Sequence, residues 1–92
     1  MPKQLLKLPR YKMENHLHLI SNNGGTFAKA SLELSTVQMP SALIGSLGYA
    51  YESCLFVIGG NSEVLARYDS RSEAVQGHYE LALKHNLKHL VI

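Results

Sequence analysis

Histidine is the residue type in this chain that most readily does chemistry, and two of its five histidines share one predicted helix face. His78 and His85 are seven residues apart, which corresponds to about 20° around a helix and about 10.5 Å along its axis. One zinc ion, with nitrogen ligands at about 2.0–2.1 Å, cannot bridge that separation. Each imidazole is therefore expected either to hydrogen-bond a backbone carbonyl or a tyrosine hydroxyl in the core, or to lie at a pocket floor or a subunit interface.

Two further histidine pairs have spacings that metal sites use. His85 and His89 have the four-residue spacing of two ligands on one helix face, but Asn86 is predicted to end the helix between them. His16 and His18 lie two apart on a predicted strand and would need a third ligand. Because the sequence has no cysteine pair and no carboxylate at helical spacing from a histidine, we expect neither a metal site nor a cofactor.

Nucleophilic catalysis also lacks its usual pattern. Ser46 lies in Gly45-Ser46-Leu47-Gly48, which does not have the Gly-x-Ser-x-Gly spacing that exposes a catalytic serine. Cys54 belongs to an apolar run, where a thiol stays protonated. No glycine-rich phosphate loop is present, and the nearby carboxylates are expected to be solvated: Glu52, Glu63 and Asp69. The sequence predicts a protein that is not an enzyme.

The overall composition indicates one small folded domain. The chain has 92 residues, of which 46% are hydrophobic and 17% charged, too apolar for a disordered tail. The longest apolar run, Cys54–Ile58, is far shorter than the ~20 residues of a membrane helix. One cysteine cannot form an internal disulfide, and no export signal is readable. We therefore expect a cytoplasmic protein that does not enter the membrane.

Charge is distributed unevenly along the chain. Residues 1–31 carry a formal charge of +4 and residues 32–92 a charge of −2. Residues 1–13 contain two prolines and no clean period, so they are predicted to form an extended basic arm ahead of a single domain over residues 14–92. Such an arm can meet nucleic acid, an acidic protein or a second copy of the chain. Its cations are Lys3, Lys7, Arg10 and Lys12.

Alternating apolar residues and turn residues predict five strands, bounded at 16–20, 26–38, 50–58, 63–68 and 87–92. The second strand does not keep one alternation, so a bulge or break is expected near Ser35. Residues 21–25 carry a hairpin turn signal, and residues 39–48 read as an uncharged loop. The run Cys54–Ile58 is apolar on both faces, which is typical of a strand inside a sheet.

The helix has the clearest boundaries. Ser70 and Glu73 form a capping box, in which each side chain can bind the other residue's backbone N–H. An apolar stripe with helical spacing follows, and Asn86 suits a left-handed cap, so a helix is predicted over residues 71–86. The result is an α+β domain: a four- to five-stranded, mostly antiparallel sheet with one helix on one face.

One helix cannot cover both faces of a sheet. The second face must be shielded by the uncharged loop, by the first hairpin or by another subunit, and we favour a homodimer or higher homo-oligomer. Tyrosines beside exposed apolar loop residues are typical of protein interfaces. The predicted surface for a partner or for self-association therefore comprises Leu43, Ile44, Leu47, Tyr49 and Tyr51.

Three stretches carry a resemblance: Leu34-Ser35-Thr36-Val37, Tyr51–Phe56, and Arg67–Ala74 followed by Gly77-His78. Together they resemble a family of short bacteriophage and prophage proteins, over about residues 34–85. The family pattern runs Ser-Thr-Val, a loop, Tyr/Phe-Glu-Thr with an apolar pair and Phe, a turn, Arg-Tyr, and Glu-Ala with Gly-His on a helix. In the family the loop often carries Asp-His, which residues 39–48 lack. The resemblance implies a phage accessory protein in the host cytoplasm; the family has no assigned activity, so no site residue is carried over.

Four hypotheses follow, of which the last is a metal-dependent hydrolase that would have to retain bound metal through purification without added metal. The first is an inhibitor that binds a host protein or an antiviral defence complex, in the manner of an anti-CRISPR protein. The second is an oligomeric sponge that sequesters a signalling nucleotide, with phosphate contacts from Arg67, Arg71 or His78 near a helix N-terminus. The third is nucleic-acid binding through the basic arm, which should weaken steeply with salt.

Overall fold

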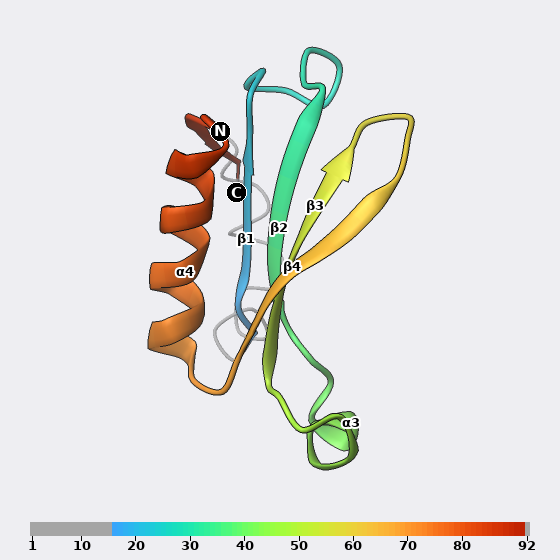
Figure 1. The fold of residues 1–92 in the computed structure, drawn as a ribbon, viewed down its shortest axis with the longest axis vertical. Helices are drawn as coiled ribbons and strands as arrows, with labels where there is room; N and C mark the ends of the chain where they lie inside the picture. The colour runs from blue at the N-terminus through green and yellow to red at the C-terminus, as the bar shows by residue number, and fades with distance from the viewer. Residues whose placement is uncertain (1–15, 92) are drawn as a thin grey trace.

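Among the described residues, 16–91, five strands form one antiparallel sheet, and a long helix covers one of its faces (Figure 1). This structure is a computed structural model, and the predicted basic arm over residues 1–13 lies outside the described residues. The sheet order is β4-β3-β2-β1-β5. The elements, in chain order, are β1 His18–Asn22, β2 Leu32–Gln38, α3 Ser41–Leu47, β3 Tyr51–Val57, β4 Ser62–Tyr68, α4 Arg71–Lys84 and β5 His89–Val91.

The predicted fold class is confirmed. All four strand pairings are antiparallel, and α4 contacts β1, β2, β3 and β4 from one side. β3 lies between β2 and β4, as its apolar residues on both faces indicate, while β2 is the central strand. None of the helices within residues 16–91 has the length and apolar character needed to cross a membrane.

The boundaries of α4 follow the predicted caps. The Glu73 backbone N–H donates to Ser70 Oγ at 3.2 Å, and the Ser70 N–H donates to Glu73 Oε1 at 3.2 Å, which completes the capping box. At the other end the helix stops at Lys84, and Asn86 has the left-handed φ of 59° that the sequence predicts. These caps satisfy backbone groups that a helix leaves unpaired at its ends.

The prediction of a loop over residues 39–48 is wrong, because α3 lies within it. Pro40, with φ −57°, precedes the first helical residue, and Gly48 closes the helix with φ 84° and an N–H donated to the Ile44 carbonyl at 3.0 Å. Proline before a helix and glycine after it are helix boundary signals. The sequence predicts a loop here because the seven residues between Pro40 and Gly48 are too few to show a helical period.

The second strand begins later than predicted and is regular. Residues 26–30 form a turn in which the Thr26 carbonyl accepts the N–H of Lys29 and of Ala30, so β2 starts only at Leu32. The expected bulge near Ser35 is absent from the β2 pairings; the irregularity lies instead in β4, opposite Ser53 and Cys54. The predicted hairpin turn at residues 21–25 is the start of a longer loop, where Asn22 Oδ1 accepts the N–H groups of Gly24 and Gly25.

Alternation along the strands separates two faces. The face under α4 carries Leu34, the centre of a small core with Ala82 and Leu87. The same face carries small hydroxyl residues, which are fully or almost fully buried: Ser21, Thr36 and Ser53. The opposite face, the open face, has no helix over it within residues 16–91 (Figure 1). By strand register it carries Glu52, Cys54 and Phe56 of β3.

Candidate functional site

A continuous chain of hydrogen bonds runs through the buried side of the sheet. Ser21 Oγ lies 2.8 Å from His78 Nε2, and His78 Nδ1 lies 2.7 Å from Thr36 Oγ1. From Thr36 the chain continues to Ser53 Oγ at 2.6 Å and from there to the Tyr68 hydroxyl at 2.9 Å. One side chain from each of β1, α4, β2, β3 and β4 therefore takes part, and the sheet and helix are joined at their centre.

Every side chain in this hydrogen-bond network has at least one partner. Within residues 16–91, no buried side-chain nitrogen or oxygen lacks a hydrogen-bond partner. A neutral imidazole has one donor and one acceptor nitrogen, so the network can run in either of two directions. In one direction Tyr68, Ser53 and Thr36 donate in turn toward His78, which donates to Ser21; in the other Ser21 donates to His78, which donates to Thr36, and the donation continues to Tyr68. Both directions satisfy every member. His78 was predicted to bind a carbonyl or a tyrosine hydroxyl, and its direct partners are instead a serine and a threonine.

Burial makes the His78 imidazole a weak base. Its side chain is fully buried, and the loss of hydration lowers the pKa of His78 from 6.5 to about 4. The imidazole is therefore neutral at physiological pH and has no access to solvent. It links α4 directly to β1 and β2, and it has no route to an external substrate.

The lowered pKa of His78 predicts acid sensitivity. The unfolded chain takes up a proton on His78 near pH 6.5, but the folded protein does so only near pH 4. The contribution of His78 to the free energy of unfolding is therefore constant well above pH 6.5 and falls as the pH approaches 4. The loss from this group is expected to reach about 2–3 kcal/mol near pH 4.5. Urea unfolding at pH 7.5 and pH 4.5 measures it. A His78→Gln variant, less stable at pH 7.5, should lose less on acidification; an equal loss would contradict the assignment to His78.

Gly77 lets the end of this chain reach the helix. A Cβ placed on Gly77 would lie 2.4 Å from the Tyr68 hydroxyl and ring, well inside van der Waals contact. The Tyr68 ring therefore packs directly on the backbone of α4, and this position keeps its hydroxyl beside Ser53. Gly77 and His78 are neighbours in α4, and they contact the same network at different points: Gly77 at Tyr68, its last member, and His78 at Ser21 and Thr36.

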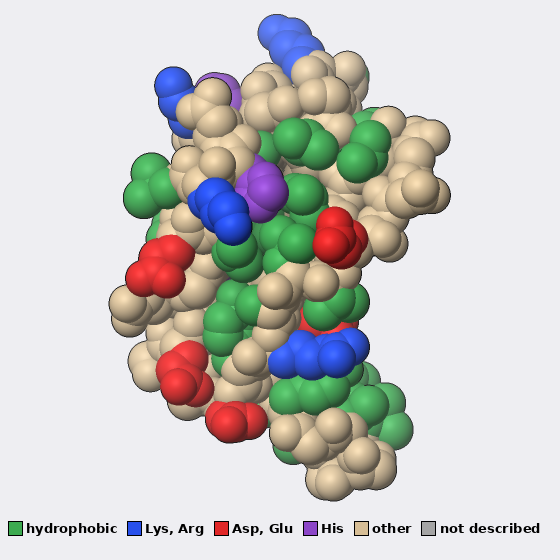
Figure 2. Space-filling model, viewed as in Figure 1, with side chains coloured by type: hydrophobic (Ala, Val, Ile, Leu, Met, Phe, Trp, Pro, Cys, Tyr) green, Lys and Arg blue, Asp and Glu red, His purple; other side chains and the backbone are tan. Residues whose placement is uncertain are grey.

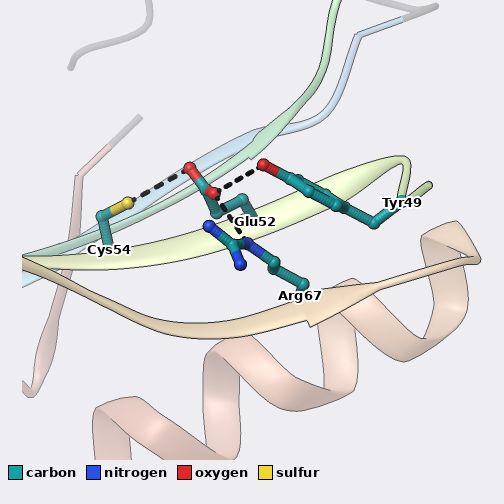
Figure 3. Close-up of polar contacts among 4 residues, drawn as sticks. All are labelled: Tyr49, Glu52, Cys54 and Arg67. Atoms are coloured by element: carbon teal, nitrogen blue, oxygen red, sulfur yellow. Dashed lines mark hydrogen bonds and ion pairs between the residues drawn. The ribbon is translucent and has the colours of Figure 1, made fainter. Parts of the chain in front are cut away.

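A second polar cluster lies on the open face, at the end near α3 (Figure 3). The Glu52 carboxylate accepts three hydrogen bonds: from the Tyr49 hydroxyl at 3.1 Å, from Arg67 Nε at 3.2 Å and from the Cys54 thiol at 3.5 Å. The Arg67 guanidinium carbon also lies 4.7 Å from the centre of the Tyr49 ring. Arg67 is thus held in place by an ion pair and a cation–π contact while half of its side chain is exposed.

This cluster does not activate its cysteine. Burial raises the pKa of the Cys54 thiol, and the hydrogen bond to the Glu52 carboxylate raises it further. The thiol is protonated at neutral pH, whereas a nucleophilic cysteine needs its thiolate. In this cluster the Glu52 carboxylate orients the Arg67 and Tyr49 side chains, and it activates no nucleophile.

The predicted interface residues lie in three places. Leu43, Ile44 and Leu47 lie on α3, and both leucines are exposed, at 47% and 40%. Figure 2 shows hydrophobic side chains gathered over the end of the molecule that α3 forms. Tyr49 lies just after α3 and belongs to the cluster on the open face. Tyr51 is two residues before Ser53 on β3, so its side chain points to the same face as Ser53, the face under α4.

The residues predicted to contact phosphate groups do not meet. Arg67 lies on the open face, His78 is sealed under α4, and Arg71 is the first residue of that helix. Arg67 and His78 are on opposite faces of the sheet because β4 places alternate residues on alternate sides. His18 bonds Ser35 Oγ at 3.4 Å, His85 is the C-cap residue of α4, and the stretch 16–91 holds no cluster of three or more histidines, cysteines or carboxylates that could bind a metal.

Comparisons with protein family models, with curated proteins and with solved structures find no match for this chain. The resemblance to the phage family stays a prediction. The structure nevertheless relates its short motifs to one another. All three stretches contribute to the buried network: the first supplies Thr36, the second Ser53, and the third Tyr68 and His78.

The same motifs supply the open face, because neighbouring residues of a strand point to opposite sides. Glu52 precedes Ser53, and Arg67 precedes Tyr68, and these two preceding residues form the ion pair of the open-face cluster. Motifs that are far apart in the sequence thus belong to two contact sets, one on each face. The signal available in the sequence was the placement of small hydroxyl residues at inward strand positions opposite a histidine in a helical stripe.

Proposed function

We propose that this chain is a phage accessory protein that acts by non-covalent binding, and that it inhibits a host protein or an antiviral defence complex through α3. The phage origin rests on the resemblance of the motifs, and the binding mode rests on the surface of α3. The single observation that carries the proposal is a projecting helix that presents leucines to solvent.

The composition of α3 supports binding to an apolar groove. Against the described part of the chain none of its seven residues is buried, and its sequence contains no charge. Leu43 and Leu47 are four residues apart, so they lie on the same side of the helix. Two exposed leucines on one uncharged helical turn match the way that amphipathic helices enter hydrophobic grooves of their partners.

The base of α3 is held firmly. The Met39 N–H donates to the Ala50 carbonyl at 2.8 Å, and the Ala50 N–H donates to the Tyr68 carbonyl at 3.0 Å. Both chain ends of the helix are therefore tied to each other and to the edge strand β4. Arg67 and Tyr49 lie beside this base, and tyrosine and arginine are the residues most enriched where interfaces gain their affinity. A preorganised projection loses little conformational freedom on binding.

Replacing Leu43 and Leu47 together with serine should abolish partner binding and leave the fold intact, because neither side chain is in the core. The immobilised full chain and the Leu43→Ser/Leu47→Ser variant are exposed to bacterial host lysate, and captured proteins are quantified by mass spectrometry. We expect a host protein or complex that the wild type retains and the variant loses at least about tenfold. The activity of that captured partner should fall when the wild-type chain is added.

The matched control is Leu83→Ser, which removes a leucine of α4 that is 83% exposed. It should capture the same partner as the wild type. If the double variant captures every protein that the wild type captures, α3 is not the docking element. If the wild type instead retains a nucleotide or a nucleic acid, the sponge or the nucleic-acid hypothesis replaces this one.

A further inference from the structure

The open face carries an uncharged row that crosses all five strands. The strand register aligns Val91 of β5 with Ile20 of β1, Ile20 with Ser35 of β2, Ser35 with Cys54 of β3, and Cys54 with Val64 of β4. The row therefore reads apolar, apolar, Ser35, apolar, apolar from one edge of the sheet to the other. At a strand spacing of about 4.8 Å it is about 19 Å long.

The rows on either side each add one apolar residue near the centre, and they also carry an ion pair toward one end and one carboxylate on the central strand. On one side the register aligns His18, Val37, Glu52 and Arg67. On the other side it aligns Asn22, Glu33, Phe56 and Ser62. The charge of Arg67 is offset by its ion pair with Glu52, so the net charge of the three rows is the single carboxylate of Glu33. One charge selects only weakly between basic and acidic partners.

We propose that a second copy of this chain covers the open face, related by a two-fold axis that runs along β2 at Ser35. Such an axis exchanges β1 with β3 and β5 with β4 across the interface. Because the uncharged row is apolar on both sides of Ser35, it is complementary to itself: Ile20 of one copy meets Cys54 of the other, and Val91 meets Val64. An isologous interface requires this kind of self-complementary patch.

The neighbouring row is also compatible with this axis. Val37 lies on the axis and meets its own copy, and Glu52 of one chain comes opposite His18 of the other. Two sheets packed face to face have their side chains interdigitated across about 10 Å. The five strands together hold 29 residues. At the rise and spacing of β-strands they present roughly 470 Å² per copy, or about 950 Å² in total, close to the roughly 1,000 Å² expected of a biological interface.

Glu33 is the one unfavourable position. It lies on β2, so the two-fold axis brings the Glu33 carboxylates of both copies toward each other. Like charges at an interface weaken association. This position separates dimerisation from binding to an unrelated protein, because only a second copy supplies the same carboxylate at the same place.

The full chain and three variants are compared by sedimentation velocity and light scattering over a concentration series. We expect a wild-type dimer, and Val64→Lys should raise the dissociation constant at least about 100-fold, since it buries a lysine without a partner. Val64 is 43% exposed in one chain, so the lysine is tolerated in the monomer, as circular dichroism should confirm. Leu83→Lys on α4 should leave the dimer unchanged, and Glu33→Gln should tighten it about three- to tenfold.

A wild-type protein that is still monomeric at about 100 μM would overturn the proposal. A Val64→Lys variant that folds and still forms the dimer would also overturn it. A dimer that Val64→Lys disrupts but Glu33→Gln does not tighten would overturn the assigned axis. None of these results depends on α3, because Leu43 and Leu47 lie outside the open face. The dimer and the host-protein interaction can therefore fail independently.

Discussion

Replacing His78 with alanine is expected to lower the free energy of unfolding by about 3–5 kcal/mol. The substitution removes the hydrogen bonds of the imidazole to Ser21 and Thr36 and leaves a cavity where a fully buried ring had packed. A buried hydroxyl without its partner costs about 1–3 kcal/mol, and the cavity adds to that cost. Ser21 loses its one side-chain partner in the network, whereas Thr36 keeps Ser53.

Urea denaturation at pH 7.5, where the imidazole is neutral, measures this loss directly. His85→Ala is the matched control, because His85 lies seven residues further along and is only half-buried at the helix cap. Its cost should stay below about 1 kcal/mol. His78→Gln can keep one of the two hydrogen bonds and should fall between the wild type and His78→Ala. Equal costs for His78→Ala and His85→Ala would mean that the network does not stabilise the fold.

Gly77→Ala is expected to destabilise the protein by about 2–3 kcal/mol, although alanine is the better helix former by about 1 kcal/mol. The added methyl group would lie 2.4 Å from the Tyr68 ring, so the ring must move away from α4. Such a movement breaks the hydrogen bond between the Tyr68 hydroxyl and Ser53 Oγ. The steric cost therefore exceeds the gain in helix propensity.

Thermal unfolding of Gly77→Ala can be compared with Gly45→Ala, which changes the helical glycine of α3. Nothing lies within 4 Å of a Cβ at Gly45, so that substitution should be neutral or slightly stabilising. The clash itself is tested in a Tyr68→Ala background, where Gly77→Ala should no longer destabilise. If the cost of Gly77→Ala is the same with and without the tyrosine ring, the close contact is not its cause.

The elements with local signals were predictable from the sequence. The capping box of α4 depends on residues three apart, and Asn86 takes its left-handed conformation from its own side chain. Alternation placed Cys54 and Phe56 on the face opposite Leu55, as the register of β3 confirms. These features depend on neighbours in the sequence, so one chain contains the information.

The parts that the sequence did not reveal depend on contacts between distant elements. α3 is too short for a helical period, and its packing on the rest of the chain gives no pattern because none of its residues is buried among the described ones. The partners of His78 lie 57 and 42 residues away. Pairing a histidine with Ser21 and Thr36 requires the strand order and register, which propensity and spacing do not contain.

The hydrogen bonds at the base of α3 separate the stability of the fold from the freedom of a surface segment to change its sequence, two requirements that usually conflict in a small protein. Met39, Ala50 and Tyr68 close the sheet beneath the helix through backbone atoms, so the closure is indifferent to the side chains above it. The buried network around His78 lies on the face under α4 and contains no residue of α3. Residues 41–47 can therefore change in sequence, and even be exchanged for another segment, with little cost to folding. Under the proposed function, a changing target would be followed by substitutions confined to one surface helix. The same position is a natural graft site for a chosen recognition sequence.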